Sequence, residues 1–206
     1  MNITILGSGN VGGSLALVWS KKGHRIFIGA RNPDSSNIKN VLRESPANIT
    51  IHPISEAARL GDIIVMAVPV QALHEVINKM GNVRGKLIVD CLNPINGNLE
   101  GFNSVSEAIK AWTGSFRIIK AFNTTGSRNL MFPTYGKLKI DTFICGDHEG
   151  DKDLIKNLAV ELGFDPIDAG GLENASLLES LAKLWVNLAY RQRLGSDIAF
   201  KLLKRS

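Results

Sequence analysis

A glycine-rich turn close to the N-terminus constrains the fold of this chain more than any other feature. Residues 7–12 read GSGNVG, between an apolar run at residues 2–6 and a stretch, residues 10–22, with apolar side chains at helical spacing. In such a strand–turn–helix unit, Gly7 permits a tight turn, Gly9 admits a ligand close to the backbone, and Gly12 lets the helix pack against the strand. The N–H groups at the helix start attract phosphates. We therefore expect a dinucleotide to contact Gly7, Ser8, Gly9, Asn10, Val11 and Gly12.

Apolar runs alternate with amphipathic stretches through the first 91 residues. The pattern predicts strands at residues 2–6, 25–30, 49–52, 62–68 and 86–91, and helices at residues 10–22, 34–44 and 70–80. The apolar run that ends at Val68 is typical of a strand covered on both faces. Strands and helices that alternate in this way indicate the α/β class, with a Rossmann-type, doubly wound and mainly parallel sheet.

The end of the second expected strand indicates which dinucleotide binds. Proteins that bind NAD usually place an acid here, which accepts hydrogen bonds from the ribose 2′-hydroxyl. In this chain the segment reads Gly29-Ala30-Arg31-Asn32, with no carboxylate before Asp34. A guanidinium can hold a 2′-phosphate through paired charge-assisted bonds, whereas an acid would repel it. The sequence therefore favours NADP, with Arg31 on the phosphate and Asn32 and Ser35 beside it; a solvated loop arginine is the alternative.

The second half of the chain continues the pattern with fewer strands. We expect a short helix at residues 105–112, strands at 117–122, 140–145 and 165–168, and a helix at 152–162. The stretch 172–203 is expected to be helical, with an apolar stripe that includes Trp185 and Leu188. We predict an NADP-binding Rossmann-type domain at residues 1–170 and a helical C-terminal segment, residues 171–206, packed on it without an independent fold.

Polar or restricted residues follow three strands whose ends should share one edge of the sheet. Pro69 follows Val68 and would end the fourth strand beside the nicotinamide ribose. Asn93 and Asn123 follow the fifth and sixth strands, where their amides would lie around the reacting ring. An ordinary turn is the alternative role for each of these positions.

Composition excludes several other classes of protein. The chain has 206 residues and a net charge of +5, with basic residues spread along its length, so no nucleic-acid partner is expected. No apolar run approaches the roughly 20 residues of a membrane helix, and the N-terminus lacks the basic region of a signal peptide. Cys91 and Cys145 are too few and too far apart for a metal or disulfide framework. We expect reduced thiols, a cytoplasmic location, no metal and no membrane contact.

Five segments together resemble one family of enzymes. They are GSGNVGG, GHRIFIGARN, AVP, KAFNTTGSRNL and LAKLWVNLAYRQRLGSDIAFKLL, and the resemblance covers nearly the whole chain. The family is that of the NADPH-dependent coenzyme F-420 reductases, whose relatives include the cytoplasmic domain of the STEAP metalloreductases. The resemblance implies that Ser8, Asn10, Val11, Ala30 and Arg31 bind NADPH, and that Val68, Pro69 and Asn123 lie near the nicotinamide. The family often has Ser at the position of Ala30, so one hydroxyl contact is lost here.

The resemblance implies hydride transfer between NADPH and a second ring cofactor or electron acceptor, namely coenzyme F-420, a flavin or a ferric chelate. Such a transfer needs orientation above all, and we predict no dedicated catalytic residue. A β-hydroxyacid or imine-type dehydrogenase is an alternative, with Lys183 or Tyr190 as proton donor, and a non-catalytic NADP sensor is another. The wide apolar stripe on the last helix favours a homodimer, unless it only covers the sheet within one chain.

Overall fold

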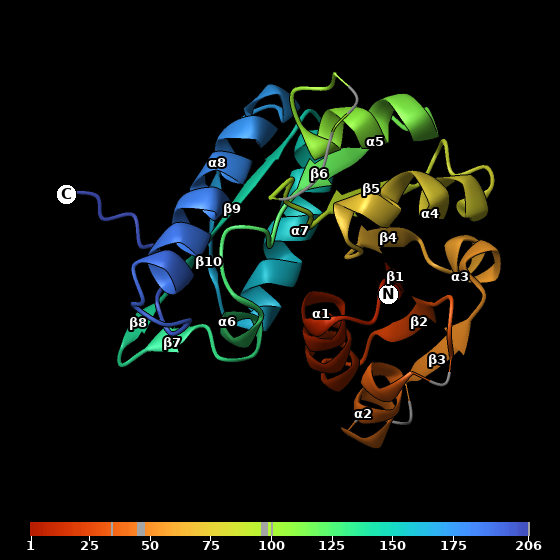
Figure 1. The fold of residues 1–206 in the computed structure, drawn as a ribbon, viewed down its shortest axis with the longest axis horizontal. Coiled ribbons are helices and arrows are strands. Elements are labelled where there is room, and N and C mark those ends of the chain that lie inside the picture. The colour runs from red at the N-terminus through yellow and green to blue at the C-terminus, as the bar shows by residue number, and fades with distance from the viewer. Residues whose placement is uncertain (34, 45–47, 96–98, 100, 206) are drawn as a thin grey trace.

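Eight strands form one twisted sheet at the centre of the molecule (Figure 1). The computed structural model describes residues 1–33, 35–44, 48–95, 99 and 101–205. The strand order is β10-β9-β6-β5-β4-β1-β2-β3. Their bounds are β1 Asn2–Leu6, β2 Arg25–Gly29, β3 Ile49–His52, β4 Ile63–Met66, β5 Leu87–Asp90, β6 Ile118–Lys120, β9 Asp141–Gly146 and β10 Asp165–Asp168.

The sheet is mainly parallel, which confirms the predicted Rossmann-type, doubly wound architecture. All pairings from β3 across to β6 are parallel, as is the pairing of β9 with β10. Only β6 and β9 run antiparallel, with Lys120 opposite Cys145. The strand order reverses between β1 and β4, and a crevice at such a switch point is the usual place for a ligand.

Helices cover both faces of the sheet because successive strand residues point to opposite sides. In β1, Ile3 and Ile5 join one buried cluster with Trp19 and other residues of α1 and α7, whereas Leu6 joins a second cluster with residues of α3, α4 and α5. The helices are α1 Asn10–Lys21, α2 Ser36–Glu44, α3 Ile54–Leu60, α4 Leu73–Met80, α5 Val105–Thr113, α6 Ser127–Met131, α7 Glu149–Leu162 and α8 Ala175–Val186.

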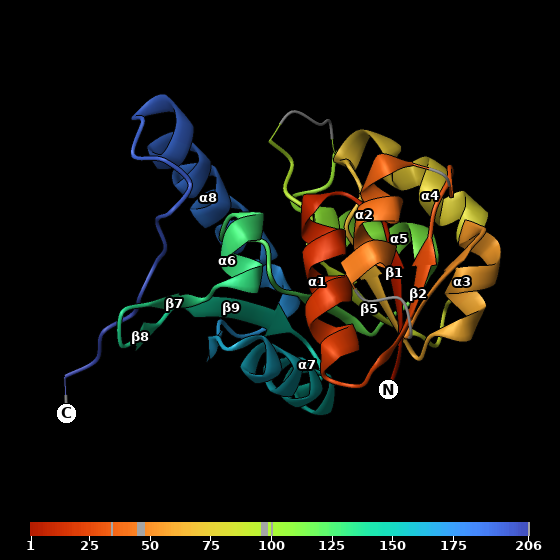
Figure 2. The same ribbon diagram turned by 90° about the horizontal axis from the view of Figure 1, so that it is seen from below.

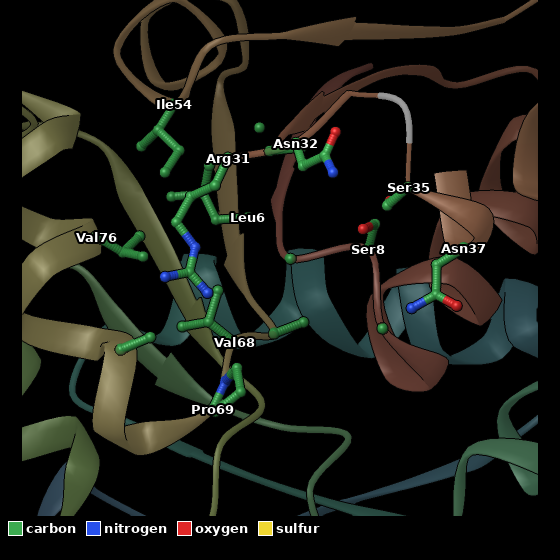
Figure 3. A pocket seen from close by; sticks show the side chains of 16 residues that line it. Leu6, Ser8, Arg31, Asn32, Ser35, Asn37, Ile54, Val68, Pro69 and Val76 are labelled. Atoms are coloured by element: carbon green, nitrogen blue, oxygen red, sulfur yellow. The ribbon is translucent and has the colours of Figure 1, made fainter. Parts of the chain in front are cut away.

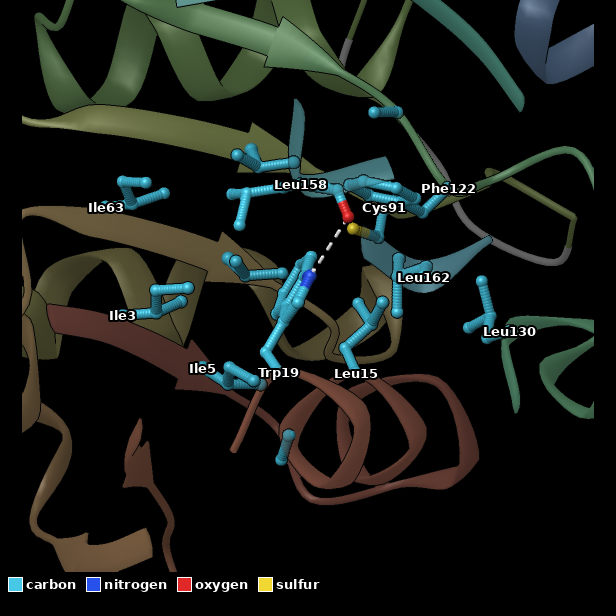
Figure 4. Packing of buried hydrophobic residues seen from close by; sticks show 14 of the residues in the cluster. Ile3, Ile5, Leu15, Trp19, Ile63, Cys91, Phe122, Leu130, Leu158 and Leu162 are labelled. Atoms are coloured by element: carbon cyan, nitrogen blue, oxygen red, sulfur yellow. Dashed lines mark hydrogen bonds between the residues drawn. The ribbon is translucent and has the colours of Figure 1, made fainter. Parts of the chain in front are cut away.

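Trp19 joins distant parts of the chain in the first of these clusters (Figure 4). Its side chain is fully buried, and its indole Nε1 donates a hydrogen bond to the Leu158 carbonyl oxygen of α7 at 3.2 Å. The ring of Phe122, which follows β6, packs edge-on against it with the centroids 5.6 Å apart. This contact fixes α1, and so the glycine-rich turn before it, relative to the end of β6.

The C-terminal segment differs in extent from the sequence-based expectation. Helix continues only through α8 and one π-helical turn, Asn187–Arg191, and residues 192–205 form no helix. Arg193 and Gly195 adopt positive φ angles of 60° and 81°, which end the helix although the apolar pattern continues. Figure 2 shows the rest of this segment as an extended chain ending away from the body of the molecule.

Short elements were missed by the sequence-based prediction. They are α3, α6, and a hairpin of β7 Thr134–Tyr135 and β8 Leu138–Lys139. The predicted start of the second helix, Asp34, lies outside the described residues, and α2 is described from Ser36. Within the described ranges, no helix has both the length and the apolar character needed to cross a membrane.

Candidate functional site

The glycine-rich turn has the shape that its sequence predicts. Gly7 has a φ angle of 108°, and a Cβ there would overlap the Ala67 carbonyl oxygen, so the turn rests directly on the end of β4. A Cβ at Gly12 would overlap the carbonyl oxygen of Gly7, which confirms its role in close helix–strand packing. A Cβ at Gly9 would meet no atom within 4 Å. The backbone at Gly9 therefore faces open space, where a ligand can approach it.

Helix α1 begins directly after this open position. Gly9 is its N-cap residue, and no side chain caps the helix. The backbone N–H groups of the first turn, around Asn10 and Val11, lie at the positive end of the helix dipole. An anion beside Gly9 would be bound by these groups.

A cavity of about 260 Å³ opens beside the turn, at the carboxyl ends of β1, β2 and β4 (Figure 3). It brings together nine of the predicted contact residues: Gly7, Ser8, Gly9, Ala30, Arg31, Asn32, Ser35, Val68 and Pro69. Asn10 lies in a smaller adjoining hollow with Ser8 and Gly9. Leu6, Ile54 and Val76 supply an apolar side of the cavity that the sequence reasoning did not include.

Polar groups gather at the end of the cavity near β2. Figure 3 shows Ser8, Asn32, Ser35 and Asn37 on one side of it, with Arg31 extended towards Val68. The Ser35 hydroxyl oxygen is buried and has no hydrogen-bond partner among the described residues. Asn37 was missed because nothing in the sequence shows that the start of α2 turns towards this cavity.

Arg31 keeps most of its guanidinium exposed. Its side chain is 61% exposed, and Nη1 lies 3.5 Å from Oε2 of Glu75 in α4. Glu75 also accepts a 2.6 Å hydrogen bond from Lys79, which lowers the pKa of that carboxyl together with the attraction of the ammonium charge. Exposed ion pairs of this kind are weak, so Arg31 can turn towards an anion in the cavity.

The predicted residue Asn123 does not line this cavity but lies further along the same edge of the sheet, after β6. Its side chain is buried, and Nδ2 donates to Oδ1 of Asn93 at 2.8 Å. In return, Nδ2 of Asn93 donates to the carbonyl oxygen of Asn123 at 2.8 Å. The two predicted rim positions are therefore joined as an amide pair.

Beneath this amide pair lie three buried charges that the sequence reasoning missed. Lys120, Asp90 and Glu179 form what we call the buried charge cluster. Nζ of Lys120 lies 2.8 Å from Oδ2 of Asp90 and 2.9 Å from Oε1 of Glu179. Burial alone would lower the pKa of Lys120, but the two carboxylates outweigh it and raise that pKa, so the ammonium stays charged. Asp90 and Lys120 each stand inside an apolar run, which was their signal, whereas Glu179 precedes Ser180 in an amphipathic stretch and had no such signal.

Neither cysteine is in a reactive setting. Both thiols are free and buried; burial raises the pKa of Cys91, and it raises the pKa of Cys145 to about 12.

Across the part of the chain that the structure describes, no group of three or more His, Cys, Asp or Glu side chains could hold a metal ion. The alternative proton donors Lys183 and Tyr190 are both exposed, Tyr190 by 63%.

The fold and the comparisons with known proteins together define the class: this chain is an NADP-dependent oxidoreductase with a Rossmann-type nucleotide-binding fold. Residues 2–94, which include the glycine-rich turn and Arg31, match the family described as NADP oxidoreductase, coenzyme F420-dependent. The resemblance inferred from the sequence is thereby confirmed for this part of the chain.

Three known proteins show how far the likeness extends. The F420-dependent NADP reductase of Methanothermobacter marburgensis is 28% identical, over 94% of this chain and 95% of the relative. The metalloreductase STEAP3 of Rattus norvegicus is 29% identical over 87% of this chain, but the match spans only 36% of that protein. A solved structure from Arthrobacter sp. FB24, provisionally assigned as an F420-dependent NADP-reductase, has the same fold, with a TM-score of 0.87 at 23% identity over 98% and 99% of the two chains.

Proposed function

We propose that this chain transfers a hydride between NADPH and coenzyme F420. The observation that carries the proposal is the cavity at the carboxyl ends of β1, β2 and β4, in which Arg31 stands where an acid would select NAD. The near full-length likeness to an F420-dependent NADP reductase supports the choice of acceptor. The nucleotide would lie across the ends of β2, β1, β4, β5 and β6, in the order in which those strands meet.

The polar end of the cavity fits the 2′-phosphate of NADP. Arg31 offers an exposed guanidinium, and the buried Ser35 hydroxyl, which has no partner among the residues that the structure describes, can donate to a phosphate oxygen. Asn32 lies in the same wall. Ala30 contributes only backbone and a methyl group, so Arg31 and Ser35 would carry the recognition.

The middle of the site fits a pyrophosphate. The open face of Gly9 lets phosphate oxygens come within hydrogen-bond distance of the backbone, and the first turn of α1 supplies N–H donors and a favourable dipole. Gly7 and Gly12 set the angle at which that helix starts. Ser8 and Asn10 line the adjoining hollow and would contact the same phosphates.

The far end of the site would hold the nicotinamide, which supplies the hydride when it is bound. Val68 and Pro69 would form the wall beside it, and the pair of Asn93 and Asn123 would close the end. These residues would set the distance and angle between two stacked rings, which is the main requirement of hydride transfer. No proton donor is required for this step.

Anaerobic oxidation of NADPH carrying deuterium at C4 tests the proposal. The acceptors are F420, FMN, FAD and ferric citrate, with a small imine and a β-keto acid for the alternative enzyme class. We expect F420 to be reduced and to retain the label at C5 of its deazaflavin ring. Reduction of only the imine or keto acid would favour the dehydrogenase alternative, and NADPH binding without oxidation by any acceptor would favour a sensor.

We also propose a homodimer formed by the outer face of α8, although without Trp185, which the sequence had placed in the apolar stripe. Trp185 is buried, and it packs within its own chain so closely that a Cβ at Gly126 would lie 2.6 Å from its ring. The exposed apolar side chains here are instead Leu177, Leu184, Tyr190 and Leu194, each at least 47% exposed. A second copy of α8 would cover them.

Two further proposals concern the whole chain. We propose that residues 171–206 do not fold apart from residues 1–170, because Ala175 and Leu178 of α8 bury their side chains against Cys145 of β9. We also propose a cytoplasmic location, since free thiols such as Cys91 and Cys145 persist in a reducing compartment.

A further inference from the structure

Hydrogen bonds of the buried charge cluster connect four elements at one point. The Lys120 ammonium directs its three donors at Asp90, at Glu179 and at the carbonyl oxygen of Leu92, the last at 2.9 Å. Oδ2 of Asp90 also accepts from the Ser106 hydroxyl of α5, at 2.6 Å. Oε1 of Glu179 accepts from the backbone N–H of Val105 at 2.8 Å. The ends of β5 and β6 are thereby joined to α5 and to α8.

The loops that leave this cluster are the ones that carry the amide pair. The carboxylate of Asp90 accepts from the Leu92 N–H at 2.8 Å, and the carbonyl oxygen of Leu92 accepts from Lys120, so both ends of this residue are fixed next to Asn93. On α8, the carbonyl oxygen of Leu178 accepts from Nδ2 of Asn123 at 3.2 Å. Leu178 directly precedes Glu179, so the same turn of α8 contacts both the charge cluster and the amide pair.

A strained residue lies between Lys120 and Asn123. Phe122 is not a glycine, yet its φ angle is 61°, in the left-handed region that bulky residues avoid. Such a conformation persists only where the surroundings fix the chain on both sides. Here Lys120 holds one side through the charge cluster, and Asn123 holds the other through Asn93 and Leu178. The bend at Phe122 is what turns Asn123 towards Asn93.

Burying charges costs desolvation free energy, so packing alone would not favour charged side chains at this point. Apolar side chains of similar volume often stabilise a core as well as a buried ion pair does. Hydrogen bonds to a buried charge have, in addition, a defined length and direction. The arrangement is therefore suited to hold a loop in one geometry.

We propose that Lys120, Asp90 and Glu179 are positioning residues, which hold the pair of Asn93 and Asn123 in place at the nicotinamide end of the site and make that geometry depend on α8. The proposal rests on the proposed binding of NADPH, and it does not depend on which acceptor is reduced. In this proposal the buried charge cluster contacts neither the nicotinamide nor the acceptor ring, and it acts through Asn93 and Asn123.

The test compares ligands with and without a nicotinamide. The main variant is Lys120→Met with Asp90→Asn and Glu179→Gln, which removes the charges without leaving one unpaired. Lys120→Met alone and the isosteric Glu179→Gln alone complete the series. The matched control is Lys152→Met, which removes a buried lysine paired with Asp168 and Glu149 at the opposite edge of the sheet. Dissociation constants for 2′,5′-ADP and NADPH are measured by calorimetry. The rate of single-turnover oxidation of NADPH is measured with saturating F420 as the hydride acceptor.

We expect the charge-free variant to bind 2′,5′-ADP within about threefold of the wild type and to transfer hydride about ten- to a hundredfold more slowly, as a misplaced ring would. The ratio of the 2′,5′-ADP dissociation constant to the NADPH dissociation constant should fall together with the hydride-transfer rate. Glu179→Gln, which preserves shape and fold, should lower the hydride-transfer rate about threefold by the same effect. Lys152→Met should change neither the ratio of the two dissociation constants nor the hydride-transfer rate.

Wild-type rates and ratios in the folded cluster variants would overturn the proposal, and so would equal losses for both ligands, since these would indicate only general support of the fold. If the triple variant fails to fold, the result for Glu179→Gln decides. A wild-type protein that binds neither ligand would instead refute the proposed function, on which this inference depends.

Discussion

Arg31 is the residue on which the choice of nucleotide depends. Replacing it by Asp should weaken NADPH binding by about 1.5–3 kcal/mol, the scale of a hydrogen bond to a charged group, because the new carboxylate repels the 2′-phosphate. Binding of NADH, which lacks that phosphate, should change much less. Fluorescence titration with both nucleotides measures the difference. Glu75→Gln is the matched control: it removes the carboxylate 3.5 Å from Arg31, and it should leave NADPH binding unchanged or slightly tighter. Equal losses for both nucleotides in Arg31→Asp would remove Arg31 from the phosphate site.

A substitution at Gly9 should abolish nucleotide binding without disturbing the fold. Because a Cβ there meets no atom within 4 Å, Gly9→Val should fold normally, while its side chain occupies the place of the pyrophosphate. We expect a native circular dichroism spectrum and no detectable NADPH binding. Gly150→Val on α7 is the control, since a Cβ at Gly150 is equally unobstructed and lies outside the nucleotide site. Retained NADPH binding in Gly9→Val would show that the phosphates lie elsewhere.

At the scale of single elements, Asp168 at the end of β10 joins that strand to α7. Burial would raise the pKa of Asp168, but the Gly170 N–H and the ammonium groups of Lys156 and Lys152 outweigh it and lower the pKa to about 2. A depressed carboxyl pKa contributes stability that is complete above the ordinary value, 3.8, and is lost as pH falls through about 2.

Asp168→Asn should therefore lower the free energy of unfolding at neutral pH, and the difference from the wild type should shrink as the pH falls from 3.8 towards about 2. The loss should be on the order of 1 kcal/mol, because the side chain is 33% exposed and solvent screens its charge. Urea denaturation of both proteins from pH 7 to pH 2 gives the difference. Asp153→Asn, at a more exposed partner of Lys156, should have a smaller effect. A difference that grows towards low pH would contradict this assignment.

Several strands and the long helix α1 were predictable from sequence, because a strand shows its apolar pattern within a few residues and a long helix spans several turns. Strands β1, β3 and β10 have the predicted bounds, and α1 ends one residue before its predicted end. Elements as short as α3 and α6 are too brief to show a helical period. The end of α8 depends on positive φ angles at Arg193 and Gly195, whereas the apolar pattern runs on past them.

The adenosine end of the candidate site was predictable for a different reason from the nicotinamide end. Gly9 and Arg31 belong to a local strand–turn–helix pattern with known spacing. The buried charge cluster combines Asp90, Lys120 and Glu179 from three distant parts of the sequence, and only the tertiary fold brings both carboxylates within 3 Å of the Lys120 ammonium. For Asp90 and Lys120, a charge within an apolar run was the available signal, and it carried no information on the partner.

At the scale of the whole molecule, the exposed apolar face of α8 predicts association. Light scattering should give a mass twice that of the 22.4 kDa chain, because pairing two such faces removes Leu177, Leu184 and Tyr190 from water. Leu184→Glu should shift the protein to monomer. Val160→Glu on α7, at a residue that is 53% exposed, should not. A monomeric wild type at micromolar concentration would refute the dimer.

The position of β1 in the middle of the sheet has a consequence for how the protein is made. During synthesis on the ribosome, the residues proposed to bind the nucleotide emerge first, since Gly9, Arg31 and Pro69 all precede β5 in the sequence. These residues follow β1, β2 and β4, and β1 pairs with both of the other strands. Glu179, which completes the buried charge cluster, emerges only with α8. A nascent chain can therefore bind the nucleotide well before it has the geometry for hydride transfer. Newly made protein would bind NADPH but transfer its hydride only slowly until the last helix docks.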